Sequence, residues 1–328
     1  MKKMSRQIPF SIVTTCRNEM ESLPRWKKDI LAQSRPPGEI VVVDAFSDDG
    51  TFEFLTQWAQ RDARVKIIQE KGMPAHGRNF AIQNAAHEHV LSTDLGVGLS
   101  KDWCQELIAP FENDPNLEVV AGNTCIDRET IHSPWARAEY WMENGGEPKH
   151  RSGHVPSNRS SAYKKSVWKR LRGLPEDLTF AADDAVYGRQ ILQEGLKIAF
   201  APNAMTYWGR PNKAKLFFRE QYVYGRGDGE AFIKTPLVFK WHLRGSVPAL
   251  FVPLLHVGVQ CLKLPFYKGL GKAVVNGDLP AFFTMPLLMG GRAFHYAKGY
   301  LQGHGHGQRY CLDCRSRLRR NFNGYSIK

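Results

Sequence analysis

The chain has 328 residues, 42% of them hydrophobic and 23% charged, which excludes a disordered protein and leaves room for one large α/β domain with an appendage, or for two domains. Six scattered cysteines argue against a disulfide scaffold and indicate a reducing compartment, and the basic N-terminus shows no apolar signal-peptide segment. Residues 1–200 hold 26 Lys and Arg against 27 Asp and Glu, but residues 201–328 hold 19 against 5. Because this second part is both basic and apolar, it favours binding to an anionic membrane surface or an anionic acceptor. Nucleic-acid binding ranks lower, since we find no motif for it.

The first elements in chain order alternate between strand and helix. Strands are predicted at 10–15, 39–44 and 65–68, with helices at 23–32 and 52–62 between them. This βαβαβ order indicates a parallel sheet with right-handed crossovers. Asp44 ends the second strand, at the sheet edge where open α/β sheets bind ligands. The alternative is an ordinary strand-to-helix turn with solvated acids.

The following segment adds charged residues at ends of elements. A Gly-rich loop opens a helix near Arg78, which is either placed to meet a base or phosphate or is a plain surface residue. A strand at 90–96 carries Asp94 near its end. Further elements are predicted as helices at 99–111, within 130–150 (running into a basic loop) and at 167–173, and strands at 118–123, before 163 and at 197–202.

An acid pair begins another predicted helix. Asp183 and Asp184 open a helical pattern that Gly195 ends. Acids in a first turn also compensate the helix dipole, by roughly 0.3–1 kcal/mol, so the pair alone does not establish a catalytic site.

The composition changes after about residue 235. The run 247–262 is nearly all apolar but holds Pro248 and Pro253, and it is shorter than the ~20 residues of a spanning helix. We expect interfacial or hairpin-like membrane contact, or alternatively a buried helix pair. The predicted units are 1–232, a catalytic α/β domain, 233–302, an apolar helical segment, and 303–328, a basic tail.

The tail holds four possible zinc ligands at short spacing: His304, His306, Cys311 and Cys314. A flexible tail is the alternative, because glycines alternate with the histidines. The basic run 315–320 either binds anionic lipid headgroups or is solvated.

An ordered set of these motifs resembles the family 2 glycosyltransferases over about residues 8–230. Its pieces are Ser11-Ile12-Val13, Asn18-Glu19, Val43-Asp44, Asp49-Gly50-Thr51, Gly77-Arg78-Asn79, Thr93-Asp94, Asp183-Asp184 and Gly195. The segments 156–162 and 221–229 further resemble a bacterial subgroup of sugar transferases.

The resemblance implies a GT-A nucleotide-sugar-binding fold, Rossmann-like with a mostly parallel sheet, and inverting transfer from a nucleoside diphospho-sugar. By this resemblance, the base of the nucleotide would be contacted by Thr15 and Asp44, with Arg78 beside them, and Glu19 would support the nucleotide pocket. Asp94 would contact the ribose and the metal-bridged diphosphate. Asp184 would act as the general base, with Asp183 as the acid beside it. Arg159 and Gln221 are expected at the acceptor or the diphosphate. A divalent Mg²⁺ or Mn²⁺ would neutralise the leaving group.

Two departures from the family pattern remove metal ligands. The second acid of the Asp-x-Asp element is Gly96 here, and Trp208-Gly209-Arg210 stands where a histidine is frequent. We therefore expect a weakly held metal on Asp94, with Arg210 and Arg226 sharing the diphosphate charge.

The sequence thus predicts a polysaccharide-building glycosyltransferase of the cell envelope. It would use a nucleotide sugar, with UDP favoured, and a lipid-linked or saccharide acceptor, at the cytoplasmic face of a bacterial inner membrane. The alternatives are a sugar-phosphate nucleotidyltransferase, whose Gly- and Lys-containing signature we do not find, and a non-catalytic membrane-associated scaffold.

Overall fold

The computed structural model describes residues 7–143 and 156–318. The predicted basic loop falls mostly at 144–155, and the end of the basic run at 319–320, so both lie outside the described residues. The strands are β1 (Phe10–Cys16), β2 (Glu39–Asp44), β3 (Val65–Gln69), β4 (His89–Ser92), β5 (Val97–Leu99), β6 (Val119–Ile126), β7 (Ser161–Lys164) and β8 (Ile198–Trp208).

Helices follow most of these strands. In the first part of the chain they are α1 (Leu23–Leu31), α2 (Thr51–Arg61), α3 (Pro74–Asn84), α4 (Trp103–Asn113), α5 (Pro134–Met142), α6 (Lys165–Arg170) and α7 (Asp183–Gln193), with a 3₁₀ turn η1 (Arg128–Thr130). The later ones are α8 (Ala214–Glu230), α9 (Leu237–Leu243), η3 (Ala249–Phe251), α10 (Val252–Cys261), α11 (Leu264–Val275), α12 (Leu279–Tyr310) and α13 (Leu312–Arg317).

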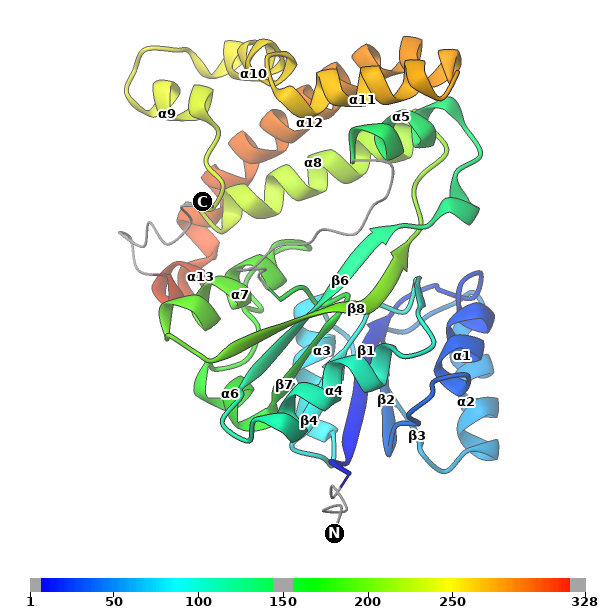
Figure 1. Ribbon diagram of the computed structural model, residues 1–328. Coiled ribbons are helices and arrows are strands. Elements are labelled where there is room, and N and C mark those ends of the chain that lie inside the picture. Colours follow the sequence, from blue (N-terminus) through cyan, green and yellow to red (C-terminus); the bar gives the residue numbers. More distant parts are fainter. Residues whose placement is uncertain (1–6, 144–155, 319–328) are drawn as a thin grey trace.

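The strands form one sheet in the order β3-β2-β1-β4-β7-β6-β8-β5. Strands β3, β2, β1 and β4 run parallel, and β6 and β8 are also parallel, while β7 is antiparallel to both of its neighbours. Apolar side chains on the two faces form separate cores, one under α1, α2 and α4 and the other under α3, α6 and α7. This mixed α/β architecture confirms the predicted fold class (Figure 1).

One predicted helix begins later than expected. The segment 97–99 is strand β5, paired antiparallel with β8, and α4 starts only at Trp103. Strand β8 also continues to Trp208 rather than ending near residue 202. The cause is tertiary pairing, because a three-residue strand has too little periodicity to be recognised without its partner.

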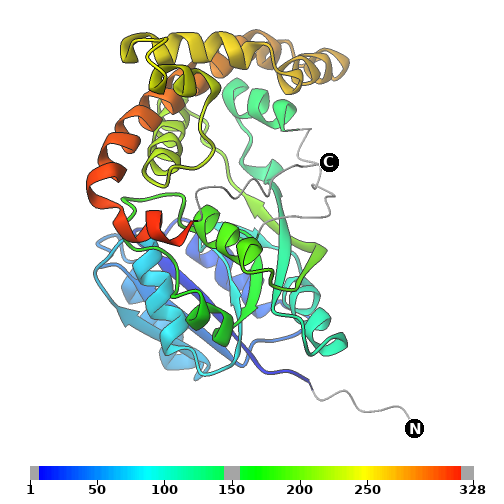
Figure 2. The same ribbon diagram turned by 90° about the vertical axis from the view of Figure 1, so that its left-hand side faces the viewer.

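A helical layer lies over the carboxyl edge of the sheet. Helix α12 runs alongside α8 and ends at α13, which packs against α7 (Figures 1 and 2). The boundary predicted at residue 303 therefore falls inside α12, and the described part of the tail is helical.

Glycines spaced by four allow α8 and α12 to touch through their backbones. A Cβ at Gly225 would lie 2.0 Å from Tyr296 O, and one at Gly303 would lie 2.0 Å from Arg226 O. Gly229, Gly299 and Gly307 are similarly crowded by backbone of the other helix. Small residues at this spacing permit close helix approach, so these glycines are packing residues rather than flexible linkers.

We expect Gly303→Ala to lower the free energy of unfolding by roughly 1–3 kcal/mol, because the added methyl group forces the two backbones apart. The matched control is Gly305→Ala in the same helix, where no described residue beyond the adjoining turns of the helix comes within 4 Å of the new Cβ. Since alanine is the better helix former, this control should gain about 0.5–1 kcal/mol. Urea unfolding of both variants measures the difference, and equal stability would contradict the packing role.

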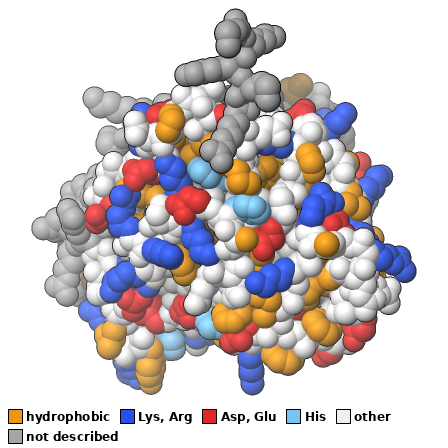
Figure 3. Space-filling model, turned by 90° about the horizontal axis from the view of Figure 1, so that it is seen from below, with side chains coloured by type: hydrophobic (Ala, Val, Ile, Leu, Met, Phe, Trp, Pro, Cys, Tyr) orange, Lys and Arg blue, Asp and Glu red, His pale blue; other side chains and the backbone are white. Residues whose placement is uncertain are grey.

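The outer helices expose many apolar side chains. Leu250, Leu254, Leu262, Val275 and Phe283 are 60–86% exposed. The opposite face of the molecule carries interspersed charges of both signs and only scattered apolar side chains (Figure 3). Within the described residues no single helix meets the length and apolarity of a membrane span, but the pair 249–261 and 264–275, bent by 56°, meets them together.

Candidate functional site

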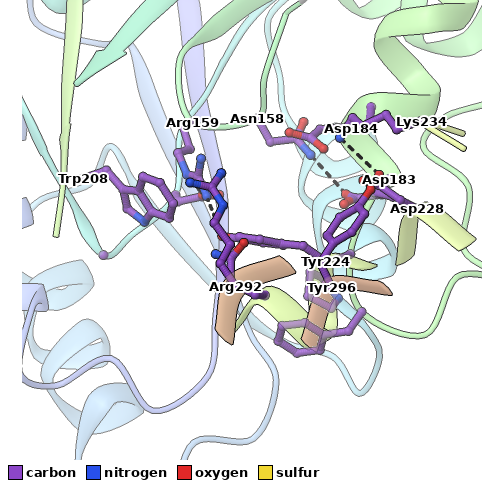
Figure 4. Close-up of a pocket in the computed structure, with 18 of the residues that line it drawn as sticks. Asn158, Arg159, Asp183, Asp184, Trp208, Tyr224, Asp228, Lys234, Arg292 and Tyr296 are labelled. Atoms are coloured by element: carbon purple, nitrogen blue, oxygen red, sulfur yellow. Dashed lines mark hydrogen bonds and ion pairs between the residues drawn. The ribbon is translucent and has the colours of Figure 1, made fainter. Parts of the chain in front are cut away.

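A cavity of about 1360 Å³ opens between the carboxyl edge of the sheet and the helical layer (Figure 4). Its wall includes Thr15 near the end of β1, Glu19 in the loop after it, Asp94 after β4, and the acid pair that begins α7. Residues of α10 and α12 form the opposite wall. The cavity exceeds the roughly 300–1,000 Å³ usual for one small ligand, so a nucleotide and a second substrate fit together.

Arg78 of α3 joins two of the predicted acids. Its guanidinium donates to Asp94 Oδ1 at 2.5 Å and to Asp183 Oδ2 at 3.2 Å. Its side chain is only 12% exposed, and its Nε has no hydrogen-bond partner among the described residues. The arginine is therefore a central structural element of the pocket, and the alternative of an isolated surface residue is wrong.

The two neighbouring acids have different environments. Asp183 is buried and also accepts a hydrogen bond from Asn158 at 3.0 Å. Burial, opposed by Arg78 and assisted by Asp184 and Asp94, raises the pKa of Asp183 to about 6. Asp184 is partly exposed to the cavity, and its carboxylate accepts a hydrogen bond from Ser157 Oγ at 3.1 Å. Asp184 is thus the accessible carboxylate, and Asp183 is held in the wall.

The raised pKa of Asp183 has a consequence for stability. Between its usual value of 3.8 and about 6, the folded protein holds the proton more tightly than the unfolded chain. The contribution of Asp183 to the free energy of unfolding therefore falls as pH rises from about 4 to 6. We expect Asp183→Asn to remove this decline, which urea unfolding at pH 4, 5, 6 and 7 measures. Parallel pH profiles for the variant and the parent would contradict it.

The segment before α7 is fixed by the C-terminal helices. Glu230 of α8 accepts from Thr179 N at 2.9 Å and from Thr179 Oγ1 at 2.6 Å. Cys311 Sγ donates to Asp177 O, and Cys314 N donates to the carboxylate of Asp177. These contacts tie the position of the acid pair to α8, α12 and α13.

The structure does not assemble the four predicted zinc ligands. His304 packs against the rings of Phe232 and Phe239, with centroids 4.8 and 4.9 Å away. Among the described residues the metal-capable group is instead Glu230, His306 and Cys311, whose ligand atoms lie within 4.8 Å of one another. Burial raises the pKa of Cys311 to about 12, and its Sγ donates a hydrogen bond to Asp177 O.

Asp44 does not line the cavity. Its side chain is fully buried and accepts from Ser47 Oγ at 2.5 Å, Ser47 N at 3.1 Å and Gln69 Nε2 at 3.2 Å. It therefore shapes the turn after β2, while the neighbouring Ala45 reaches the cavity. Thr15 and Glu19 line the cavity as predicted, and burial raises the pKa of Glu19, with a further contribution from the charge of Asp94.

The four residues expected at the acceptor or diphosphate separate into two pairs. Arg159 and Gln221 line the cavity, and Arg159 Nε lies 3.5 Å from Asp94 Oδ2. Arg210 is buried outside the lining, bonded to Glu139 and Glu220, so its charge is already balanced. Arg226 is also outside it and pairs with Glu230 at 3.0 Å. These placements argue against the predicted diphosphate role of Arg210 and Arg226.

Several cavity residues were not predicted individually, although Asp228 lies in the segment 221–229 that the resemblance includes. Asp228 of α8 is buried, 3.1 Å from Lys234 Nζ, and accepts from Tyr296 at 2.7 Å. Arg292 of α12 and Lys263 after α10 bring positive charge to the far wall. Lys263 and Arg292 are far from the motifs along the chain, so no sequence pattern identified them.

Comparisons with known proteins agree with this geometry. A family model described as glycosyl transferase family 2 matches residues 11–172. The succinoglycan biosynthesis protein ExoA of Rhizobium meliloti is 23% identical over 298 residues, which are 84% of this chain and 90% of that protein.

Two solved structures share the fold. The mannosyltransferase PcManGT of Pyrobaculum calidifontis, in complex with GDP-Man and Mn²⁺, matches with a TM-score of 0.56 at 20% identity. The match covers 90% of this chain and 88% of the PcManGT chain. Residues 1–349 of S. aureus TarS, in complex with UDP, have a TM-score of 0.50 at 16% identity, with 91% and 90% covered.

The chain belongs to glycosyl transferase family 2 and is a glycosyltransferase of the GT-A fold.

Proposed function

We propose that this enzyme transfers a sugar, with inversion, from a nucleoside diphospho-sugar to a hydroxyl of a lipid-linked or saccharide acceptor in building a bacterial polysaccharide. The observation that carries the proposal is the single cavity that joins Thr15, Asp94 and Asp184 to the helical layer. The relative ExoA is named for succinoglycan biosynthesis, and the two structural neighbours hold GDP-Man and UDP. A UDP-sugar remains our favoured donor.

The residues that would carry out the chemistry lie on the wall opposite α10 and α12. Asp184 removes the proton of the acceptor hydroxyl as its oxygen attacks the anomeric carbon. Arg78 keeps Asp94 and Asp183 in place, and Arg159 brings a positive charge beside Asp94, where the diphosphate would lie. A bound Mg²⁺ or Mn²⁺ would supply further positive charge to the leaving diphosphate. Asp94 is the carboxylate placed to hold this ion, as hard cations prefer oxygen ligands.

We place the enzyme on the cytoplasmic face of the inner membrane, bound through its outer helices. Several apolar side chains of α10, α11 and α12 are exposed, and exposed Lys240, Arg244 and Lys268 adjoin them. Apolar side chains with basic neighbours suit a bilayer that contains anionic lipid. Because α10 and α12 also line the cavity, an acceptor in the bilayer would enter beside Lys263 and Arg292, which suit a phosphate group.

Vesicle binding tests the membrane proposal. Leu254→Glu with Leu262→Glu should reduce binding to vesicles containing phosphatidylglycerol at least tenfold, because each glutamate adds negative charge to the apolar face. Leu31→Glu is the control, since Leu31 is 52% exposed on α1, in the sheet-forming part of the molecule. Unchanged binding by the double variant would contradict this surface.

A transfer assay tests the reaction. The protein is incubated with bacterial membranes and radiolabelled UDP-, GDP-, CDP- or dTDP-sugars. Label in the organic extract identifies a lipid-linked acceptor, and label in water-soluble polymer identifies a polysaccharide. Absence of transfer from every donor would favour the scaffold.

A further inference from the structure

The family pattern lacks one acid in this chain, and the structure shows what lies in the corresponding space. Gly96 stands two residues after Asp94, where the second acid of the Asp-x-Asp element would be. A Cβ built on Gly96 would lie 3.3 Å from Glu19 Oε2 and 3.8 Å from Glu19 Oε1. The carboxylate of Glu19, from the loop after β1, therefore occupies the volume that a side chain at position 96 would enter.

The backbone of Glu19 is held from the neighbouring loop. Glu19 N donates to Thr51 Oγ1 at 2.9 Å, and Met20 N donates to Asp49 Oδ2 at 3.0 Å. On the other side, Asn18 N donates to Ser47 Oγ at 2.9 Å. The turn after β2 thus fixes the position of the loop, so the Glu19 side chain starts from a set point at the cavity wall.

The charge around Glu19 is unbalanced. Its carboxylate accepts from Ser22 Oγ at 2.7 Å, and it forms no ion pair with any residue in the ranges 7–143 and 156–318. Asp94, by contrast, already has Arg78 and Arg159 beside it. A half-buried carboxylate next to a second one, without a cation of its own, is suited to share a divalent ion.

We propose that Glu19 replaces the missing second acid, so that Glu19 and Asp94 together would hold the divalent cation of the donor site. The proposal rests on the donor site proposed above and gives that site its second metal ligand. It also revises the expectation of a weakly held metal, since the carboxylate lost at position 96 is supplied from another loop.

Metal binding by the full-length protein tests this. Mn²⁺ affinity is measured by the electron paramagnetic resonance signal of free Mn²⁺, with and without UDP. Glu19→Gln should weaken Mn²⁺ binding at least tenfold, and Glu21→Gln, an exposed neighbour outside the cavity lining, should leave it unchanged. Thermal melting of each variant checks that it is folded.

Moving the carboxylate from position 19 to position 96 distinguishes a metal-binding role of Glu19 from a purely structural one. The double variant Glu19→Ala with Gly96→Asp should recover most of the Mn²⁺ affinity, because the new acid enters the vacated volume. Parent-like Mn²⁺ binding by Glu19→Gln, or no recovery in a folded double variant, would overturn the proposal while leaving the transferase function intact. A parent protein that binds neither Mn²⁺ nor any nucleotide would overturn the donor site as well.

Discussion

Asp184→Asn should reduce the rate of sugar transfer by about 10²–10⁴-fold, the range typical of general-base catalysis. The affinity for the donor should stay within about twofold of that of the parent protein. The carboxylate borders the cavity and accepts a hydrogen bond from Ser157 Oγ. An amide of the same shape preserves the wall but cannot take up the proton of the acceptor hydroxyl. Single-turnover transfer and calorimetric donor binding separate the two effects.

Two comparisons sharpen this prediction. Asp102→Asn, at an exposed residue before α4, should behave like the parent protein. Asp183→Asn should affect donor binding and transfer together, because Asp183 pairs with Arg78 inside the wall. Full activity of Asp184→Asn would assign the base to another group.

Arg78→Met should lower the free energy of unfolding by about 3 kcal/mol and abolish donor binding. Removing one partner from a buried ion cluster leaves uncompensated charge, at a typical cost of 3–5 kcal/mol. We expect the lower end because Asp94 is 30% exposed and water softens the loss. Urea unfolding at pH 7 and diphosphate binding measure the two effects.

Conservative and remote variants act as controls for Arg78. Arg78→Lys keeps the charge but lacks the planar fork that spans both carboxylates, so it should recover only part of the stability. Arg61→Met, at an exposed end of α2, should change stability by less than about 0.5 kcal/mol. A loss no larger for Arg78→Met than for Arg61→Met would contradict the bridging role.

The sheet and much of the site follow from local patterns in the sequence. Apolar runs alternating with helical periods predicted the parallel β1–β4 part, and acids at element ends pointed to Asp94 and to the pair before α7. Each of these patterns can be recognised from residues that are close together in the sequence. The cavity then brings Thr15, Asp94 and Asp184 to one place because the carboxyl ends of adjacent strands share an edge.

What could not be predicted depends on partners distant in the chain. The sequence suggested that the charge of Arg210 is free to bind a diphosphate. In the structure Arg210 is buried and forms an ion pair with Glu139, which is 71 residues away. The alternating glycines near 303 read as flexible, although their missing side chains admit the backbone of α8. Glu19 and Gly96 likewise reveal their relation only after folding brings the two loops together.

Calorimetric titration with UDP, GDP, CDP and dTDP, each with and without Mn²⁺, tests the donor site most directly. The account predicts that one diphosphate binds with one-to-one stoichiometry, more tightly when Mn²⁺ is present, and that Asp94→Asn abolishes this metal-dependent gain. A protein that binds none of the four diphosphates under either condition would contradict the donor site and favour the non-catalytic scaffold.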